Sequence, residues 1–240
     1  DEYFFLYKTI PQYKYLNNEM TLADFKIIFY WEYFHRFLGR VIGLFFLIPL
    51  VYFYFSKKIN KKFIKSCYLI LILILLQGFM GWYMVKSGLV NNVSVSHYRL
   101  SAHLFLAFLI ISIIFWCLLN FKNKTNKNFF SNKNDNFIFG FLIFLISIQV
   151  LMGAFVSGLD AGKIYQTWPS MNNNFFPDDI SVSNLFETNI FSDPSIVQFL
   201  HRNMAYIIFI YISALSFYIF SKKMSYLYTP LFYVLAMVFV

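Results

Sequence analysis

Three of the four histidines lie at or near the starts of long apolar runs: His35, His103 and His201. Ionisable side chains within membrane-spanning helices are costly to bury and are usually functional. If the helices alternate in direction, the three histidines come to a similar depth, and His35 and His103 can face each other. Paired imidazoles on facing helices bind a haem iron from both sides. We therefore predict haem ligation by these three, and a loop position without a ligand role for His97.

A small residue follows each predicted ligand by four positions: Gly39, Ala107 and Ala205. Position i+4 lies on the same helix face, where a flat macrocycle needs cleared space. Small residues also permit close packing of membrane helices, and that explanation stays open at each single position. The three together favour haem.

Arginine is rare in this chain, and all four arginines flank the histidine motifs: Arg36, Arg40, Arg99 and Arg202. A guanidinium group pairs with a carboxylate through two parallel hydrogen bonds, as a haem propionate requires. We expect these arginines to bind the cofactor, with anchoring at the membrane interface as the alternative.

Glu32 lies three positions before His35, on the same face of a helix, and Gln198 takes the matching position before His201. A carboxylate beside a porphyrin can stabilise positive charge or move a proton. We predict that Glu32 is catalytic and that Gln198 belongs to a site that only holds a cofactor. The alternative for Glu32 is a residue that caps its helix at the interface.

The elements that must position these residues are membrane helices. The chain is 59% hydrophobic and 13% charged, whereas about 25% of a soluble domain is charged. Apolar runs long enough to cross a bilayer recur. The expected helices cover 41–56, 66–85, 100–121, 136–159, 203–221 and 224–240. The predicted fold is an all-α polytopic membrane protein.

Lysines gather in three short connections, at 56–65, 122–135 and 221–224, which fall on one side when six helices alternate. The positive-inside rule places that side in the bacterial cytoplasm or the mitochondrial matrix. The net charge of +9 therefore indicates membrane topology, and we expect no nucleic-acid partner. Cys67 and Cys117 have no ligand spacing and are interpreted as packing residues.

Two motifs recur along the chain. An aromatic-x-His-Arg motif includes His35 and later His201, and a Gln-x-x-x-Gly motif, followed by Ser-Gly-Leu, begins at Gln77 and at Gln149. Such repeats are common in membrane folds built from duplicated bundles. The offsets predict a parent of tandem four-helix bundles, of which this chain shows six of eight helices. A complete six-helix protein is the alternative.

Five segments resemble signatures of heme A synthases of the mitochondrial and alphaproteobacterial type. The sequence Glu-Tyr-Phe-His-Arg at 32–36 looks like the Glu-x-x-His-Arg signature of that family, and 20–26 is similar to the outer loop before it. The segment 98–104 is similar to the fourth-helix histidine segment. The segments 153–162 and 198–202 look like second-half signatures. The resemblance covers essentially the whole chain in register.

The resemblance implies oxidation of the C8 methyl of haem O to a formyl group, which gives haem A for cytochrome c oxidase. Residues 1–121 would form the first bundle and bind haem O between His35 and His103. Residues 122–135 would be a basic connection, and 136–240 would bind haem b through His201 and a histidine outside this chain. Glu32 would stabilise positive charge or activate water.

The implied setting is the mitochondrial inner membrane or the bacterial cytoplasmic membrane. Partners would be lipid, an unidentified electron donor and, more loosely, haem O synthase, oxidase assembly factors and further copies of the chain. Two other functions stay open. A di-haem b-type cytochrome would transfer electrons and use the same histidines without Glu32, and a transporter would hold no haem.

Overall fold

The computed structural model describes residues 1–58, 61–89, 93–125, 127, 129, 137–180 and 189–238. Regular structure in these residues is helical apart from one isolated bridge, Met171 with Asn174, which confirms the all-α prediction. The chain forms two compact units, Asp1–Phe130 and Ser131–Val240. The boundary between them in the sequence falls within the predicted connection 122–135, most of which lies outside the described residues.

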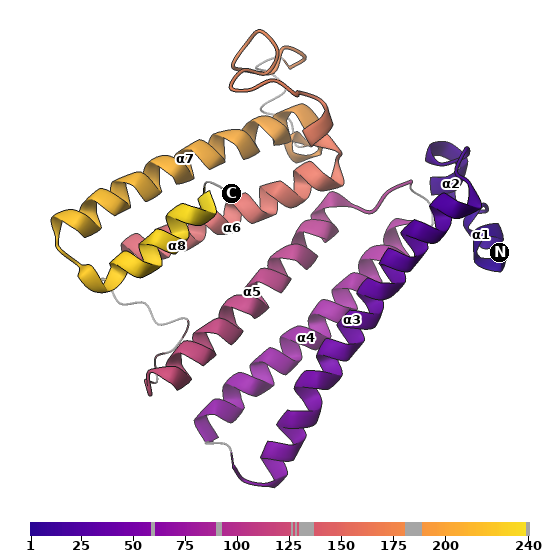
Figure 1. Ribbon diagram of the computed structural model, residues 1–240. Helices are drawn as coiled ribbons and strands as arrows, with labels where there is room; N and C mark the ends of the chain where they lie inside the picture. Colours follow the sequence, from indigo (N-terminus) through magenta and orange to yellow (C-terminus); the bar gives the residue numbers. More distant parts are fainter. Residues whose placement is uncertain are drawn as a thin grey trace. The chain divides into compact units, whose positions relative to one another are not determined.

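The first unit is built on three long helices, α3 (Leu22–Phe55), α4 (Lys61–Gly88) and α5 (His97–Lys122). Two short helices precede them, α1 (Glu2–Tyr7) and α2 (Pro11–Leu16). Helix α4 packs against both α3 and α5, and consecutive long helices run in opposite directions (Figure 1). This arrangement brings the middle of α4 next to the histidine-bearing part of α5.

Helix α3 begins well before the expected span 41–56, so that His35 lies inside the helix and does not open it. Thr21 caps the helix, because its hydroxyl accepts from the Asp24 amide while the Asp24 carboxylate accepts from the Thr21 amide. Phe25 in the first turn is buried and contacts aromatic rings of α1. The cap and this cluster extend the helix beyond the apolar run that crosses the membrane.

The second unit contains α6 (Phe137–Gly158), α7 (Pro194–Ser221) and α8 (Tyr228–Val238). Helix α7 packs along α6, and α8 folds back on α7 around a cluster of Leu215, Ile219 and Leu231. Asp193 caps α7 by accepting from the amides of Ser195 and Ile196. The helix therefore starts nine residues before the expected start at 203, and His201 lies in its third turn.

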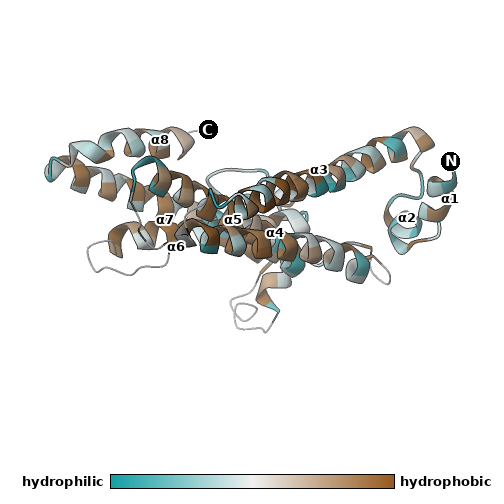
Figure 2. Cartoon of the chain, turned by 90° about the horizontal axis from the view of Figure 1, so that it is seen from below, coloured by the Kyte–Doolittle hydropathy of each residue, from teal (hydrophilic) through white to brown (hydrophobic). Residues whose placement is uncertain are grey.

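Among the residues that the structure describes, five helices are long and apolar enough to cross a membrane: α3, α4 from Phe63 onward, α5, α6 and α7. Figure 2 shows hydrophobic residues along most of their length. Large apolar side chains face outward, such as Phe45 of α3 with 79% of its surface exposed, which suits contact with lipid. The sixth expected span, 224–240, is a shorter apolar helix in the described residues, α8.

Three of the long helices end at lysines. Lys57, Lys124 and Lys223 follow α3, α5 and α7 with left-handed backbone, φ 56°, 52° and 53° respectively. A left-handed residue after a helix lets the chain turn away while its amide pairs with one of the last carbonyl groups. Cations also suit the negative end of a helix dipole. The lysine-rich connections thus terminate helices as well as carrying charge.

The segment between α6 and α7 is held by a buried tyrosine. The hydroxyl of Tyr165 lies 2.7 Å from Asp178 Oδ1 and 2.6 Å from Asp179 Oδ1. The hydroxyl of Ser195, in the first turn of α7, donates to Asp179 Oδ2 at 2.6 Å. Burial, followed by these hydrogen bonds, raises the pKa of Tyr165, so its hydroxyl stays protonated as a donor.

Acidification is expected to loosen this segment. Hydrogen bonds from Tyr165 and Asn172 hold the pKa of Asp178 below its ordinary value of 3.8. The stabilisation is therefore present above pH 3.8 and is lost as the pH falls through the lower folded-state pKa. Hydrogen exchange of 160–180 should rise in that window. The Asp178→Asn variant should lack this component, and an unchanged pH profile in the variant would contradict the assignment.

Candidate functional site

The imidazole of His103 is held against helix α4. Gln77 Nε2 lies 3.3 Å from His103 Nε2 and donates to the His103 carbonyl oxygen at 3.1 Å. One turn later, a Cβ atom added at Gly81 would lie 3.0 Å from His103 Cε1. The ring therefore occupies space that exists because residue 81 has no side chain.

The imidazole of His201 has the same surroundings in the second unit. Gln149 Nε2 of α6 lies 3.4 Å from His201 Nε2. A Cβ atom at Gly153, one turn after Gln149, would lie 3.3 Å from His201 Cε1. We call each such set of a glutamine and the glycine four residues later a Gln–Gly cradle. Each unit contains one cradle on one helix and its histidine on the next.

The cradles are functional positions that the sequence interpretation missed. The Gln-x-x-x-Gly repeat is visible in the sequence, where it predicted only a duplicated bundle. The structure shows that His103 and His201 share one environment, whereas the sequence motif paired His201 with His35. His103 and His201 are each the histidine of the second helix in an antiparallel pair, α4 with α5 and α6 with α7.

Filling the first cradle should destabilise the protein. Gly81→Ala places a methyl group 3.0 Å from His103 Cε1, so the ring must shift, and overpacking typically costs about 1–3 kcal/mol. Gly78 on the same helix is a matched control, because a Cβ atom there would meet nothing within 4 Å. Thermal unfolding in detergent should show a loss for Gly81→Ala and none for Gly78→Ala. Equal effects would contradict the packing argument.

His35 belongs to an open surface of α3 beside the cradled His103. It is exposed, and its helix packs against α4, the helix whose Gln77 and Gly81 hold the ring of His103. A Cβ atom at Gly39, one turn later on the same face, would meet nothing within 4 Å. Both predicted ligands thus belong to the three-helix unit, and there is open space beside His35.

Glu32 makes an ion pair with Arg36 one turn later on α3. Both side chains are about half exposed, 49% for Glu32 and 50% for Arg36. The helix is capped by Thr21, so the alternative role of Glu32 as a cap residue is wrong. The carboxylate is available beside His35 and is paired with a cation of its own helix.

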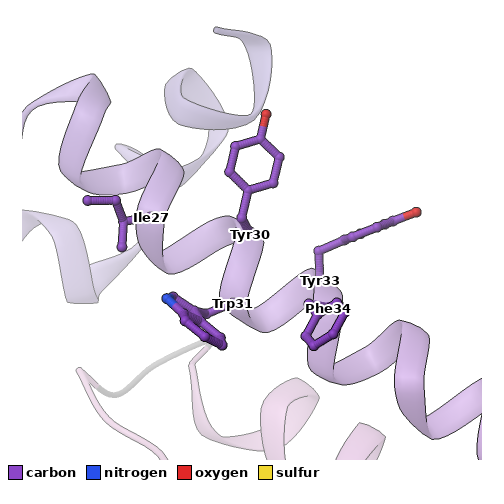
Figure 3. A pocket seen from close by; sticks show the side chains of 5 residues that line it. All are labelled: Ile27, Tyr30, Trp31, Tyr33 and Phe34. Carbon is purple, nitrogen blue, oxygen red and sulfur yellow. The ribbon is translucent and has the colours of Figure 1, made fainter.

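An aromatic hollow covers another face of α3 at the same level (Figure 3). It is lined by Ile27, Tyr30, Trp31, Tyr33 and Phe34. Four of these residues are spaced i, i+3, i+4 and i+7, the pattern of one helix face. These side chains are exposed on α3, in the stretch of the helix that contains Glu32 and precedes His35.

Gln198, which matches Glu32 in the repeat, has a different environment. It is 5% exposed and pairs with the backbone of Tyr165, accepting from its amide at 3.2 Å and donating to its carbonyl at 2.8 Å. Arg202, one turn later, donates to the carbonyl groups of Tyr165 and Thr167 at 2.7 and 2.8 Å. Both side chains attach the segment between α6 and α7 to the helix that carries His201.

The other two predicted cofactor-binding arginines lie in the first unit. Arg40 is exposed on α3, one turn after Arg36. The guanidinium of Arg99 lies 5.1 Å from the centre of the Tyr83 ring, a cation–π contact between α5 and α4. Pairing of Arg36, Arg40, Arg99 and Arg202 with propionates stays a prediction.

His97 is the first residue of α5, and its expected loop position is therefore wrong. Its ring contacts the neighbouring Tyr98, with centroids 4.1 Å apart. In the sequence, the polar stretch 91–99 precedes the apolar run 100–121. In the structure, the helix begins before that run, because Ser96 is the residue just before its first turn. His97 thus lies two turns before His103.

The cradled histidines have the chemistry that a haem needs. Within the described part of the chain, His103 Nδ1 and His201 Nδ1 are buried without a hydrogen-bond partner. Buried polar atoms of this kind require an explanation, such as an unseen ligand. In the same residues, no three His, Cys, Asp or Glu side chains gather as a metal cluster. A porphyrin supplies its own equatorial nitrogens, so one or two imidazoles are enough.

Comparison with known proteins identifies relatives along the whole chain. Residues 1–240 match the family model COX15-CtaA, described as cytochrome oxidase assembly protein. A heme A synthase from Pelagibacter ubique is 48% identical over 239 residues, which cover 99% of this chain and 69% of the relative. Heme A synthases from Rickettsia canadensis and Nitrosospira multiformis are 42% and 45% identical over 89% and 86% of this chain.

This chain spans only part of those relatives, 63% of the Rickettsia protein and 58% of the Nitrosospira protein. No solved structure matches it. The match of the family model over residues 1–240 and the identity of 48% over nearly the whole chain exceed what a shared fold alone would produce. The chain therefore belongs to the cytochrome oxidase assembly protein family, which includes heme A synthases.

Proposed function

We propose that this chain is part of a heme A synthase, which oxidises the C8 methyl of haem O to the formyl group of haem A. The observation that carries the proposal is that the two units have similar histidine sites, which differ in one residue near the histidine. Each unit holds a histidine in a Gln–Gly cradle, but the first has an accessible carboxylate, Glu32, three residues before His35, where the second has the buried amide of Gln198 at the matching position. The names of the relatives support the same activity.

In the first unit, His35 and His103 would hold haem O as the substrate. The cradle fixes His103 on α5, and the open space at Gly39 leaves room on the His35 face of α3. Arg36, Arg40 and Arg99 lie on the same helices and are candidates to pair with the propionates. Holding the substrate from two helices would fix its position relative to Glu32.

Glu32 is the proposed catalytic residue of the first unit. It lies one turn from His35, and Arg36 keeps a positive charge at its carboxylate. An ionised carboxylate can stabilise positive charge that develops at the methyl carbon, or accept a proton from water.

In the second unit, His201 would hold haem b, together with a histidine outside this chain. Haem supplies the electron transfer that the oxidation requires. Gln198 and Arg202 would keep the segment between α6 and α7 over this end of α7, which limits access to the cofactor. Gln198 offers an amide without a titrating group, which suits a site that stores electrons and performs no proton transfer.

The proposed location is the cytoplasmic membrane of a bacterium or the mitochondrial inner membrane, with the lysine-rich ends facing the cytoplasm or the matrix. The charges of the lysines that follow α3, α5 and α7 support this sidedness. The predicted histidine sites lie toward the opposite ends of these helices. An electron donor or acceptor and oxidase assembly factors are the expected partners.

The test is extraction of the haems from the purified full-length protein after expression with and without a supply of haem O. The proposal predicts bound haem b in both cases and haem A only when haem O is supplied. A protein that binds haem but never yields haem A would be a di-haem b-type cytochrome. A protein without any haem absorbance would leave the transporter interpretation.

A further inference from the structure

The lysine-rich connections form one basic surface at one end of the first unit. Because consecutive long helices run in opposite directions, the end of α3, the start of α4 and the end of α5 lie at the same end of the unit (Figure 1). The ring of Phe63 on α4 lies 6.0 Å from that of Phe121 on α5, centroid to centroid, so these two helix ends touch. We call the exposed lysines of this end the lysine patch: Lys57, Lys58, Lys65, Lys122, Lys124 and Lys127.

The positive charge of the lysine patch is not balanced by carboxylates of the described residues. Between Glu32 and Asp135 the chain contains no aspartate or glutamate. The ion pairs among the described residues are Arg36 with Glu32 and Lys163 with Asp160, so no lysine of the patch has a carboxylate partner there. Like charges at one end of a unit repel each other, and an external anion would relieve this repulsion.

Two of the lysines lie back along the helices that they follow. Lys58 Nζ lies 3.5 Å from the Tyr52 hydroxyl and 5.7 Å from the centre of the Tyr52 ring, beside the last turns of α3. After α5, the Lys127 carbonyl oxygen accepts from Trp116 Nε1 at 3.1 Å and from Asn120 Nδ2 at 3.2 Å. Tyrosine and tryptophan at the ends of spanning helices are typical of the headgroup level of a bilayer. The lysine patch is therefore expected at that level.

We propose that the lysine patch binds the headgroups of anionic phospholipids in the leaflet at this end of α3, α4 and α5. The inference goes beyond the proposed function, because it requires that these helices cross a membrane but requires no haem. Clusters of about four to eight basic residues directly beside a spanning helix attract anionic lipids. At the headgroup level, a lipid phosphate can reach the ammonium groups without leaving the bilayer.

The residue type of the patch also fits a lipid surface. All four arginines of the chain lie in or beside the histidine motifs, and the basic residues of 56–65 and 122–135 are all lysine. A lysine ammonium is a point charge on a flexible stem, whereas a guanidinium binds one phosphate in a fixed, two-pronged geometry. Flexible point charges can follow mobile headgroups. An acidic protein segment is the other class of partner with matching charge, and the position beside Tyr52 and Trp116 favours lipid.

The opposite end of the same unit provides a matched control. Three exposed lysines lie there, on α1, α2 and the first turns of α3: Lys8, Lys14 and Lys26. The same stretch contains carboxylates that can balance them: Asp1, Glu2, Glu19, Asp24 and Glu32. Removing these lysines changes the net charge as much as removing three lysines of the patch, but at an end where acidic side chains are present.

The experiment measures how spin-labelled phosphatidylglycerol and spin-labelled phosphatidylcholine associate with the full-length protein in phosphatidylcholine bilayers. Wild type should prefer phosphatidylglycerol by at least about 5-fold, the factor expected for one lysine near an anionic headgroup. Two triple variants should each lose most of this preference, and the control variant should retain it. The patch variants are K57Q/K58Q/K65Q and K122Q/K124Q/K127Q, and the control is K8Q/K14Q/K26Q.

Sodium chloride at about 1 M should also abolish the preference, because the screening length falls to about 3 Å. Inorganic phosphate should act no more strongly than sodium chloride at equal ionic strength. Stronger competition by phosphate would show a site for the free anion and would overturn the proposal. An equal loss in the control variant would also overturn it, because total charge and not the patch would then attract the lipid. Equal association of both lipids with wild type would exclude lipid and leave an acidic protein segment as the partner.

Discussion

Replacing Glu32 by glutamine is expected to abolish the conversion of haem O to haem A while both haems stay bound. The amide keeps the shape of the side chain and can still accept from Arg36, so the fold of α3 is retained. The ion pair is about half exposed, and such pairs contribute only about 0–1 kcal/mol. What disappears is the negative charge and the capacity to take a proton, and general-base catalysis typically contributes about 10²–10⁴-fold.

The measurement is the ratio of haem A to haem O extracted from full-length variants, with the visible spectrum as a record of binding. Glu19→Gln is the matched control, because Glu19 is an exposed carboxylate before α3 and is remote from the histidines in sequence. Glu32→Asp should retain part of the activity. Full conversion by Glu32→Gln would remove the catalytic role and favour the electron carrier over the enzyme.

Much of the architecture follows from the one-dimensional pattern. Apolar runs of sufficient length predicted the helices, because a membrane admits no backbone that is not hydrogen-bonded within its own segment. The histidines were visible because an imidazole in such a run is costly and rare. The structure gave His201 an environment like that of His103, each ring lying against the preceding long helix.

The helix starts were predicted less well, because they depend on local caps and on contacts outside the membrane. Thr21 and Asp24 begin α3 far ahead of its apolar run, and Asp193 begins α7 before its run. Polar residues around these caps resemble a loop when hydropathy alone is considered. The same bias placed His97 in a loop, although it is the first residue of α5.

The partners of the site residues could not be predicted, because they lie far apart in sequence. Gln149 meets His201 across 52 positions, and Arg202 meets Tyr165 across 37. A sequence motif does not predict which carbonyl group an arginine side chain will donate to. Arg202 donates to two carbonyl groups of the loop, which the motif did not predict, and its pairing with a propionate stays a prediction. The Gln-x-x-x-Gly repeat could have pointed to the cradles, since two identical spacings before two histidine helices suggest a shared contact.

Separate removal of the two cradled histidines is expected to empty separate sites. His201→Ala should lose haem b from the second unit, and His103→Ala should lose haem O from the first while haem b stays. Loss of an outer-sphere contact alone costs about 10–100-fold in affinity, so loss of the ligand itself should lower the haem content by at least that factor. Quantitative extraction of each haem from full-length variants measures both effects.

His97→Ala is the matched control for these variants, because His97 lies on the same helix as His103 and is not an expected ligand. It should retain both haems. Added imidazole should restore haem to His103→Ala and His201→Ala, since Ala leaves the cradle beside each glycine empty and a free ring can occupy it. If His201→Ala kept haem b and His97→Ala lost it, His201 would not be the haem b ligand. The assignment of haem O to the first unit and haem b to the second would then be wrong.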